Sequence, residues 1–307
     1  MPQISDSCIP PVDCLIVGGG PAGLAAATYL ARYRRSVLVA DEGESRAALI
    51  PESHNYPGYA GISGPDLLAL LRRQAEQFGA RLVEGRVEAI QPAGEQLFTA
   101  RVQGIDVQAR TILMATGIID IEPDFPGVKQ ALKTGALRYC PICDGFEAMD
   151  QRIGVLGPLQ NAGRKALFLR SYSADIEVLL TEALGALDEE LLSELREAGI
   201  GIGRAALVDI EQHEEGYAAI YPDGGREEFD VIYPALGAEI RSELARGLGA
   251  ECDPAGCLIV DQNQYTNVRG VLAAGDVVSD LHQLSVAVGH AAIAATAIHN
   301  GLPRNPR

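Results

Sequence analysis

A glycine-rich turn near the N-terminus limits the possible folds of this chain more than any other feature. Residues 15–17 (Leu-Ile-Val) predict a short buried strand that runs into the turn Gly18–Gly23. An Ala- and Leu-rich stretch to about Tyr33 predicts a helix, and a second strand at 36–40 ends at Asp41. This strand–turn–helix–strand order, followed by an acid, is the dinucleotide-binding unit of doubly wound α/β folds. We therefore expect a Rossmann-like domain at the start of the chain.

The residues of this turn each have a physical role in such a unit. Gly18 allows the tight turn, Gly20 lets the backbone approach a pyrophosphate, and Gly23 lets the helix pack close to the strand. Pro21 and Ala22 begin the helix, whose unpaired N–H groups face the phosphates. The acid at the end of the second strand accepts the ribose hydroxyls. The pattern predicts a dinucleotide site but does not separate FAD from NAD.

A second copy of the same unit follows in the middle of the chain. Residues 151–156 and 176–180 predict strands, and between them lie the turn 157–163 and a helix at 164–171. The chain therefore contains an internal repeat of the Rossmann kind.

The second turn lacks the residues that a pyrophosphate needs. Leu159 stands where the first unit has its second glycine, and Pro158 has no N–H to donate. Glu182, after the second strand, would repel the 2′-phosphate of NADPH but could accept a plain ribose hydroxyl. Two readings stay open: a site that takes NADH in preference to NADPH, and a fold that is kept after its ligand was lost. The sequence favours the second.

The segment between the two units predicts a loop, a helix and a β-meander. Asn55 lies in a loop at 54–58 that contains Pro57 and Gly58, and residues 66–78 have the pattern of an amphipathic helix. Three strand-like runs follow, at 81–90, 96–103 and 106–114. The last of them ends in Ala115, Thr116 and Gly117, which we expect close to the cofactor. A further helix is expected at 183–198.

The C-terminal segment predicts a strand, a turn and a helix. The strand at 271–274 ends in Gly275 and Asp276, and the helix runs from Gln283 to about Asn300. A carboxylate at a strand end can bind the hydroxyls of a flavin's ribityl chain, and the helix N-terminus can face an electron-rich flavin edge. The alternative is an ordinary strand–turn–helix in which Asp276 is the N-cap.

Cys140 and Cys143 are separated by two residues and followed directly by Asp144. Such a pair can close a small disulfide ring, or it can hold zinc if two further ligands lie nearby. The remaining cysteines contain no second pair with zinc-ligand spacing, so we expect no metal, and Cys252 and Cys257 are expected to be free thiols; the four are Cys8, Cys14, Cys252 and Cys257.

Charge and composition exclude several classes of partner. The chain has 307 residues and a net charge of −16, which argues against nucleic acids and anionic membrane surfaces. Residues 1–12 show no basic region followed by an apolar stretch, so we expect no signal peptide. The apolar run at 284–298 is too short to span a membrane. We therefore expect a cytoplasmic protein, in which a close cysteine pair is more often catalytic or metal-binding than structural.

These motifs together resemble the low-molecular-weight thioredoxin reductases and their two-domain flavoprotein relatives, over nearly all of the chain. The Cys140–Gly145 motif, placed between the two nucleotide units, is the most specific of them. The resemblance implies an α/β fold of two Rossmann-like, three-layer ββα domains. FAD would bind residues 1–117 and 241–307, and residues 118–240 would form an inserted domain that carries the disulfide. The implied flavin-site residues are Gly18, Gly20, Pro21, Ala22, Gly23, Asp41, Asn55, Ala115, Thr116, Gly117, Gly275, Asp276, His282, Gln283 and Leu284.

The resemblance also implies a reaction. Reduced FAD passes two electrons to the Cys140–Cys143 disulfide, with Cys143 as the sulfur on the flavin side. Cys140 then attacks the disulfide of a partner, and Asp144 acts as general acid and base. The implied partner is thioredoxin or a similar small dithiol protein. The inserted domain is expected to swing between flavin and partner, and the protein to be a homodimer.

Three departures from the family pattern concern the electron donor. Pro158 and Leu159 break the second glycine turn, no arginine cluster follows the second strand, and His282-Gln283-Leu284 replaces the family's Arg-Gln-Ala. We therefore predict a donor other than NADPH, such as ferredoxin or another flavoprotein. The alternatives are a thiol oxidase that uses oxygen, an NAD(P)H-dependent enzyme despite the altered turn, and a flavoprotein whose dithiol is inactive.

The net charge bears on this donor as well. An acidic donor such as ferredoxin is slightly disfavoured by the charge of −16. That objection is removed only if basic residues form a local patch, and we consider Arg32, Arg34 and Arg35 as its members.

Overall fold

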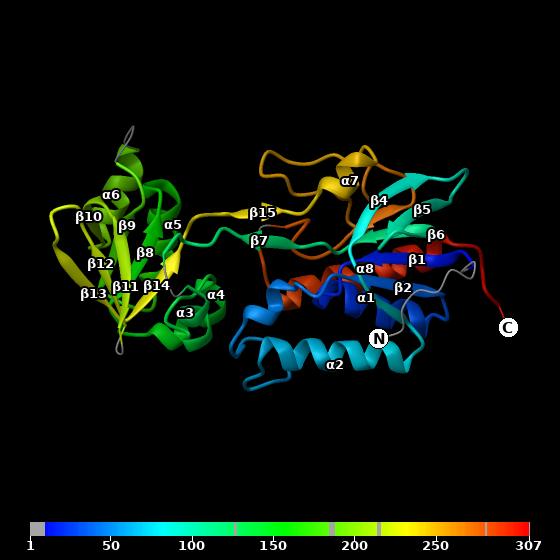
Figure 1. The fold of residues 1–307 in the computed structure, drawn as a ribbon, viewed down its shortest axis with the longest axis horizontal. Coiled ribbons are helices and arrows are strands. Elements are labelled where there is room, and N and C mark those ends of the chain that lie inside the picture. Colours follow the sequence, from blue (N-terminus) through cyan, green and yellow to red (C-terminus); the bar gives the residue numbers. More distant parts are fainter. Residues whose placement is uncertain (1–9, 126–127, 184–187, 214–215, 280, 307) are drawn as a thin grey trace.

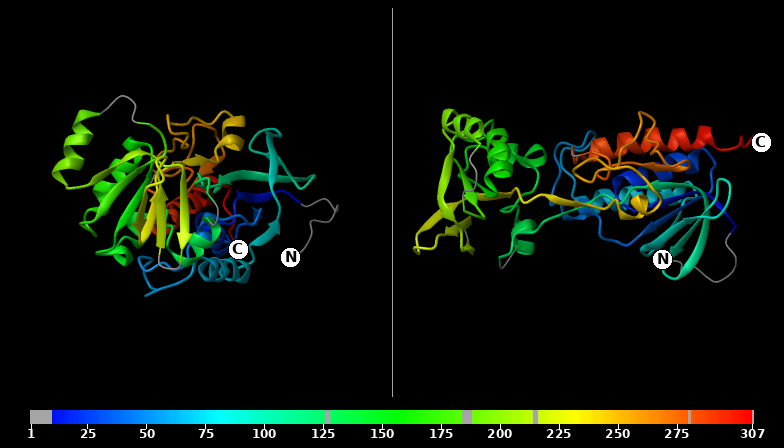
Figure 2. Two further views of the ribbon diagram at one scale, coloured as in Figure 1. Left: turned by 60° about the vertical axis from the view of Figure 1, so that its left-hand side comes forward. Right: turned by 90° about the horizontal axis from the view of Figure 1, so that it is seen from above.

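The computed structural model consists of two bodies joined by a narrow two-stranded ribbon (Figure 1). We call residues 10–117 and 241–306 the large body and residues 118–240 the inserted body. Figure 2 shows both bodies and the ribbon from two further sides. The structure describes residues 10–125, 128–183, 188–213, 216–279 and 281–306.

A seven-stranded sheet forms the centre of the large body, in the order β3-β2-β1-β6-β5-β4 with β16 beside β6. Strands β1, β2, β3 and β16 form a parallel sheet with the second half of β6, whereas β5 pairs antiparallel with its first half. Helices α1, α2 and α8 pack on one face of the parallel strands, and β4 and β5 fold over the other face (Figure 1). The bounds are β1 Val12–Val17, α1 Pro21–Arg32, β2 Val37–Asp41, η1 Arg46–Leu49, α2 Gly64–Gln77, β3 Arg81–Glu84, β4 Val87–Pro92, β5 Phe98–Val102, β6 Ile105–Met114, α7 Glu243–Gly247, β16 Val271–Ala273 and α8 Leu284–Gly301.

Apolar side chains fill both faces of the parallel sheet, because successive residues of a strand point to opposite sides. Cys14 and Ile16 of β1 pack toward the small residues of α1 and α8. Leu15 and Val17 pack on the other face, toward β4 and β5. The large body therefore has three layers: an antiparallel meander, a parallel sheet and helices.

The inserted body repeats this arrangement at a smaller scale. Its parallel sheet has the order β10-β9-β8-β14, with α5 and α6 packed on one face and the antiparallel sheet β11-β12-β13 on the other. The predicted fold class, two Rossmann-like domains of three layers, is thus confirmed. The bounds are α3 Val128–Thr134, α4 Pro141–Asp144, η2 Phe146–Ala148, β8 Ile153–Gly157, α5 Leu159–Leu169, β9 Ile176–Leu180, α6 Glu189–Glu197, β10 Gly201–Ala206, β11 Asp209–His213, β12 Gly216–Ile220, β13 Arg226–Phe229 and β14 Val231–Pro234.

The ribbon between the bodies consists of β7 (Ile118–Asp120) and β15 (Ala238–Ile240), paired antiparallel. Ion pairs hold it against the large body: Arg46 binds Asp120 through two hydrogen bonds of 2.6 and 3.0 Å, and Arg241 binds Glu42. Our predicted domain boundaries, at 117/118 and 240/241, lie at the two ends of this ribbon and stay a prediction.

Three predicted elements have different bounds in the structure. The run at 81–90 is two strands, β3 and β4, because the chain turns at Gly85 with φ of +151°. The helix predicted from Arg164 begins at Leu159, since Pro158 is its N-cap and the second turn is itself helical. The helix predicted over 183–198 begins at Glu189, where the Asp188 carboxylate caps it; residues 184–187 lie outside the described part of the chain.

One half-buried carboxyl makes the stability of the inserted body depend on pH. Glu177 of β9 lies beside Glu227 of β13, and burial, followed by hydrogen bonding to Glu227, raises the pKa of Glu177 to about 7. The ordinary pKa is near 4.5, so the folded state binds more protons between the two values, and stability falls as pH rises from about 4.5 to about 7. Arg152, 3.5 Å from Glu177 and 3.7 Å from Glu227, offsets part of this repulsion.

We predict that Glu177→Gln raises the melting temperature at pH 8 by about 2 °C and has little effect at pH 5, because the amide removes a charge that is unfavourable only above its pKa. Differential scanning fluorimetry across this pH range measures the effect. Glu84→Gln, which changes an exposed residue of β3, is the matched control. A stabilisation by Glu177→Gln that is equal at both pH values would contradict the assignment.

Candidate functional site

A cavity of about 490 Å³ opens between the two bodies at the carboxyl ends of the parallel strands of the large body. This is where open α/β sheets bind ligands, and the volume is in the usual range for cofactor sites. The predicted catalytic residues Cys140, Cys143 and Asp144 line it from the inserted body. Of the predicted flavin-site residues, Gly23 and Asn55 lie outside the lining, and the rest are in it: Gly18, Gly20, Pro21, Ala22, Asp41, Ala115, Thr116, Gly117, Gly275, Asp276, His282, Gln283 and Leu284.

The first glycine turn brings three backbone segments too close together for side chains. Gly18 has φ of +109°, and a Cβ at this position would lie 2.3 Å from the carbonyl oxygen of Ala115. A Cβ on Gly23 would lie 2.0 Å from the carbonyl oxygen of Gly18. Gly20 is the N-cap of α1, so the free N–H groups of the first helical turn are at the cavity wall. This wall of bare backbone fits the pyrophosphate of FAD.

Asp41 ends β2 at the cavity, as predicted, and its carboxylate already has partners. One oxygen accepts a hydrogen bond from the Gly43 N–H at 3.0 Å, and the other accepts from Arg72 of α2 at 2.5 Å. An ionised carboxylate has about four acceptor positions, so capacity for a ribose hydroxyl remains. The sequence does not predict this role of Arg72, because the pattern of the helix at 66–78 places Arg72 on its solvent-exposed face.

Asp276 follows β16 and faces the cavity beside Arg46, another residue that sequence reasoning missed. The Arg46 guanidinium lies 3.8 Å from the Asp276 carboxylate. Burial raises the pKa of Asp276 to about 6, and Arg46 opposes this shift. The alternative role of Asp276 as a helix N-cap is wrong, because α8 begins at Leu284 with Gln283 as its N-cap.

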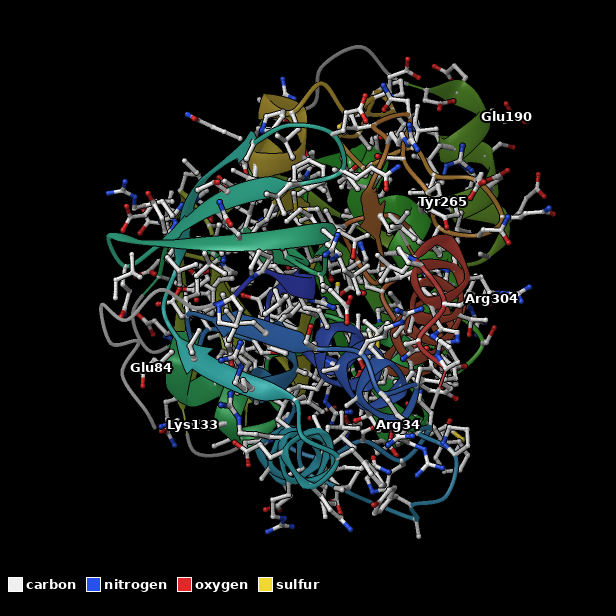
Figure 3. The ribbon with its side chains drawn as sticks, turned by 90° about the vertical axis from the view of Figure 1, so that its right-hand side faces the viewer. Arg34, Glu84, Lys133, Glu190, Tyr265 and Arg304 are labelled. Atoms are coloured by element: carbon white, nitrogen blue, oxygen red, sulfur yellow. A yellow bond between two sulfur atoms is a disulfide. The ribbon has the colours of Figure 1, made fainter. Side chains whose placement is uncertain are left out.

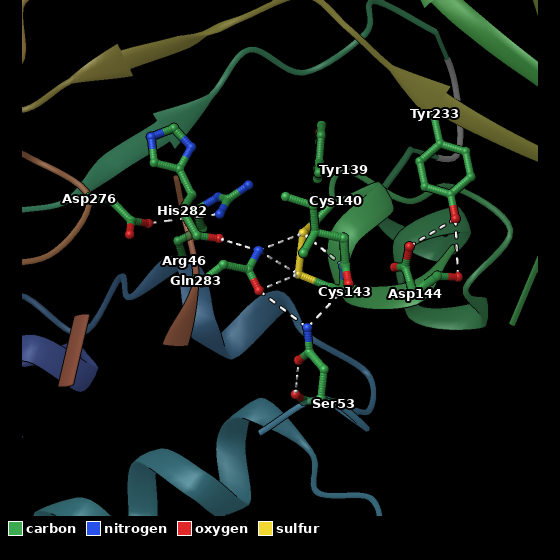
Figure 4. Close-up of a disulfide and its surroundings, with 12 residues drawn as sticks. Arg46, Ser53, Tyr139, Cys140, Cys143, Asp144, Tyr233, Asp276, His282 and Gln283 are labelled. Carbon is green, nitrogen blue, oxygen red and sulfur yellow. Dashed lines mark hydrogen bonds and ion pairs between the residues drawn. A yellow bond between two sulfur atoms is a disulfide. The ribbon is translucent and has the colours of Figure 1, made fainter. Parts of the chain in front are cut away.

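The two central cysteines are joined in a disulfide, and Gln283 holds it at the cavity wall (Figure 4). The Gln283 amide nitrogen lies 3.3 Å from the Cys140 sulfur and 3.5 Å from the Cys143 sulfur. Asn55 donates to the Gln283 side-chain oxygen and to the main-chain oxygen of Ile142, at 3.2 Å in each case. The structure thus places Asn55 against the disulfide motif, and its predicted flavin contact stays a prediction.

The Asp144 carboxyl lies beside the disulfide motif and is largely buried. Its Oδ1 accepts a hydrogen bond of 2.8 Å from the Tyr233 hydroxyl (Figure 4). Burial raises the pKa of Asp144 to about 6, against the opposing effects of Tyr233 and Arg138. An acid whose pKa lies this close to neutrality can both give and take protons at physiological pH.

The second turn has a different environment from the first. Leu159 packs its side chain on the core of the inserted body, and Pro158 offers no N–H at the start of α5. Gln160, in the first turn of α5, hydrogen bonds to the carboxylate of Asp188. Glu182 is exposed near the end of β9. The Asp188 carboxylate therefore lies beside the first turn of α5.

The surface arginines differ from the patch that we considered. Arg35 is 8% exposed, and it donates to His299 and to the main-chain oxygen of Pro303. Its guanidinium therefore binds the C-terminal segment and is not exposed for contact with a partner. Arg32 and Arg34 are exposed at the end of α1, and Arg34 is labelled in Figure 3.

The described residues contain no group of three or more His, Cys, Asp or Glu side chains arranged to hold a metal ion. Cys14, Cys252 and Cys257 are outside any disulfide, and Cys8 lies beyond the described part of the chain. Within that part, none of the helices is sufficiently long and apolar to cross a bilayer.

Comparison with known proteins identifies the family. Residues 12–292 match the family described as pyridine nucleotide-disulphide oxidoreductase. The chain belongs to this family. It is therefore an FAD-dependent disulfide oxidoreductase, in agreement with the motifs and with the cavity that joins the glycine turn to the disulfide.

Several of the similar proteins are named thioredoxin reductases. The chain is 32% identical over 295 residues to the thioredoxin reductase of Mycolicibacterium smegmatis, covering 92% of this chain and 94% of the relative. The solved thioredoxin reductase of Streptococcus pyogenes MGAS5005 has a TM-score of 0.87 at 25% identity, over 94% and 97% of the two chains. The Lactococcus lactis thioredoxin reductase, solved in an FR conformation, has a TM-score of only 0.62 at 27% identity, over 94% and 98%.

We predict that Gly23→Ala weakens FAD binding at least about tenfold, because the added Cβ would push the helix away from the turn at Gly18. Flavin absorbance relative to protein absorbance after reconstitution with FAD measures the loss. Gly289→Ala is the control, since Gly289 lies in α8 with open space around its Cβ position. Equal flavin binding by both variants would show that the close approach at Gly23 is dispensable.

Proposed function

We propose that the protein reduces the disulfide of thioredoxin or a similar small dithiol protein, with electrons from a donor other than NADPH. The observation that carries this proposal is the position of the Cys140–Cys143 disulfide, which Gln283 holds at the wall of the flavin cavity. Bound FAD supplies a two-electron carrier in that cavity. The names of the similar proteins favour thioredoxin as the partner.

The site residues divide into three roles in this proposal. The first glycine turn, Asp41, Ala115–Gly117 and Asp276 bind FAD, within a domain of residues 1–117 and 241–307. His282, Gln283 and Leu284 position the flavin edge against the disulfide, and Asn55 orients Gln283. Residues 118–240 form the inserted domain, in which Cys140, Cys143 and Asp144 carry out the exchange.

Cys140 is the better candidate for the sulfur that attacks the partner. It is the N-cap of α4, and the Cys143 N–H donates to its sulfur at 3.2 Å. A backbone donor at this position favours the thiolate form once the disulfide is reduced. Cys143 then remains on the flavin side and closes the disulfide again.

Turnover requires the inserted domain to move, because the same sulfurs must face the flavin and then the partner. The direct contacts near the disulfide are few: the bonds from Asn55 and Gln283, and a His54–Glu147 pair at 3.0 Å. The low TM-score to the reductase in the FR conformation supports a second relative orientation of the two domains. We propose that the ribbon β7–β15 is the hinge.

Exposed apolar side chains surround the disulfide motif on the inserted body. Ile142, Phe146 and Met149 are 44%, 68% and 46% exposed, respectively. Apolar groups of this size around a reactive disulfide favour a protein partner over a small hydrophilic thiol.

We further propose that the protein acts as a cytoplasmic homodimer.

The second turn supports a donor other than NADPH. Leu159 occupies the turn, and Glu182 and Asp188 would repel the phosphates of the nucleotide. Ferredoxin or another flavoprotein is the proposed donor, because each can pass electrons to a flavin without a nucleotide site.

We predict that, without oxygen, neither NADPH nor NADH at stoichiometric amounts bleaches the flavin absorbance, whereas dithionite does so promptly. Reduced ferredoxin, with thioredoxin present as acceptor, should support continuous disulfide reduction that Cys140→Ser abolishes. Bleaching by NADPH would overturn the choice of donor and indicate an ordinary NADPH-dependent reductase. Net thiol oxidation with oxygen uptake, and no thioredoxin reduction, would instead indicate an oxidase.

We predict that Phe146→Ala raises the KM for thioredoxin about tenfold and leaves kcat within about twofold, because the side chain contacts the partner and not the flavin. Phe168→Ala is the matched control: this residue of α5 is 44% exposed and lies outside the disulfide motif. A KM that changes equally in both variants would locate the docking surface elsewhere.

A further inference from the structure

The Asp144 carboxyl has an unusual partner in Tyr233. The hydroxyl of Tyr233 lies 2.8 Å from Asp144 Oδ1 and 3.2 Å from its main-chain oxygen. Figure 4 shows Tyr233 on the far side of the disulfide motif from Gln283. The single proton of this hydroxyl is therefore directed at the acid that directly follows Cys143.

The tyrosine itself is buried in an apolar strand. Tyr233 is 0% exposed, and the other residues of β14, Val231, Ile232 and Pro234, are buried as well. A hydroxyl in such a place is unfavourable unless it is hydrogen-bonded, and phenylalanine would fill nearly the same volume. The hydroxyl thus contributes hydrogen bonds, to Asp144 and to the Arg138 side chain.

The cations near Asp144 are bound to main-chain oxygens. Arg138 donates to the main-chain oxygens of Asp144 at 2.8 Å and Gly135 at 2.6 Å. Lys165 of α5 donates to the main-chain oxygens of Tyr139 at 3.1 Å and Pro234 at 2.5 Å.

These bonds leave one donor for the carboxylate itself. Among the described residues, Tyr233 is the side chain that hydrogen bonds to the Asp144 carboxylate. Glu147 of η2 is the remaining charged group close to Asp144, and its negative charge acts against ionisation. Arg138 and Lys165 act on the Asp144 carboxyl group through their charge.

We propose that Tyr233 is a positioning residue that fixes the Asp144 carboxyl, through its hydroxyl, for proton transfer to the thiolate released in disulfide exchange. The inference rests on the proposed function. Cys140 attacks one sulfur of the partner's disulfide, a new S–S bond forms, and the old one breaks with its electron pair on the leaving sulfur. Asp144 gives that sulfur one proton and becomes a carboxylate, which the hydroxyl of Tyr233 stabilises.

The electrostatics agree with this geometry. Burial raises the pKa of Asp144 to about 6, and the Tyr233 hydrogen bond is the largest effect that opposes burial. Loss of the hydroxyl should therefore raise the pKa further, because a hydrogen bond to the charged form is lost.

The first test is the titration of Asp144 in Tyr233→Phe, measured by ¹³C NMR of aspartate-labelled, oxidised holoenzyme, with the signal assigned by Asp144→Asn. We expect the midpoint to rise by about one pH unit relative to wild type. Tyr217→Phe is the matched control, because Tyr217 is also fully buried in the inserted body and its hydroxyl has no hydrogen-bond partner among the described residues. A midpoint that equals that of the control overturns the proposal.

The second test separates proton transfer from general damage to the fold. Reduced holoenzyme is mixed with bis(2-hydroxyethyl) disulfide, whose thiolate needs a proton to leave, and with 5,5′-dithiobis(2-nitrobenzoate), whose thiolate does not. The measured quantity is the rate with bis(2-hydroxyethyl) disulfide divided by the rate with 5,5′-dithiobis(2-nitrobenzoate). We expect this ratio to fall as the pH rises, with a midpoint near pH 6 in wild type and about one pH unit higher in Tyr233→Phe. In Asp144→Asn we expect the ratio to be independent of pH.

The outcomes distinguish this inference from the proposed function. A ratio that is flat with pH in wild type, or whose midpoint is the same in wild type and Tyr233→Phe, overturns the role of Tyr233. Neither measurement uses thioredoxin or the proposed donor, because dithionite can reduce the holoenzyme for the second one. Failure of thioredoxin to be reduced therefore refutes the proposed function without deciding the titration of Asp144.

Discussion

The hydrogen bonds between Gln283 and the two disulfide sulfurs connect the parts of this molecule that matter for its chemistry. Gln283 is the N-cap of α8, so its position is fixed by the helix that also covers the parallel sheet. Asn55 holds the Gln283 amide through its oxygen, which leaves the amide nitrogen directed at the sulfurs. The disulfide is thereby held against the flavin cavity by weak bonds to sulfur, which a domain movement can break at low cost.

The two Rossmann units share their packing glycines but differ in the residues of the turn. In the first unit, Gly18 and Gly23 serve the turn that faces the cavity. In the second, Gly157 still lets β8 approach the main chain of Ala235, and Gly163 lets α5 pack on α6. These glycines serve packing between elements, which the domain needs whether or not a nucleotide binds. The position that only a pyrophosphate requires is occupied by Leu159, which contributes to the core instead.

Sequence periodicity and motif order predict the repeated Rossmann architecture, and the family resemblance adds the glycine turn, several strand-end residues and the disulfide motif of the cavity wall. The strand ends are accessible to such reasoning because their order in a Rossmann unit is fixed. Arg46, Arg72, Lys165 and Tyr233 could not be predicted in the same way. Each lies on a helix or strand that is distant in sequence from its partner. The residue type alone therefore does not indicate which group the side chain contacts. The predicted start of α5, at Arg164, is also wrong. Residues 157–163 match the position of the first glycine turn in the repeat, but without the second glycine Leu159 already belongs to the helix.

The charges around the disulfide explain why proton and electron transfer can be linked in one small domain. Burial raises the pKa of Asp144 to about 6 and lowers the pKa of Lys165 to about 8, so both groups titrate close to physiological pH although each is mostly charged there. Lys165 and Arg138 hold the main-chain oxygens before and after the Cys140–Cys143 turn. Because all of these groups belong to the inserted body, the acid, its hydroxyl partner and the clamps on the turn would travel with the disulfide. The proton source would then keep the same distance from the sulfurs at the flavin and at the partner.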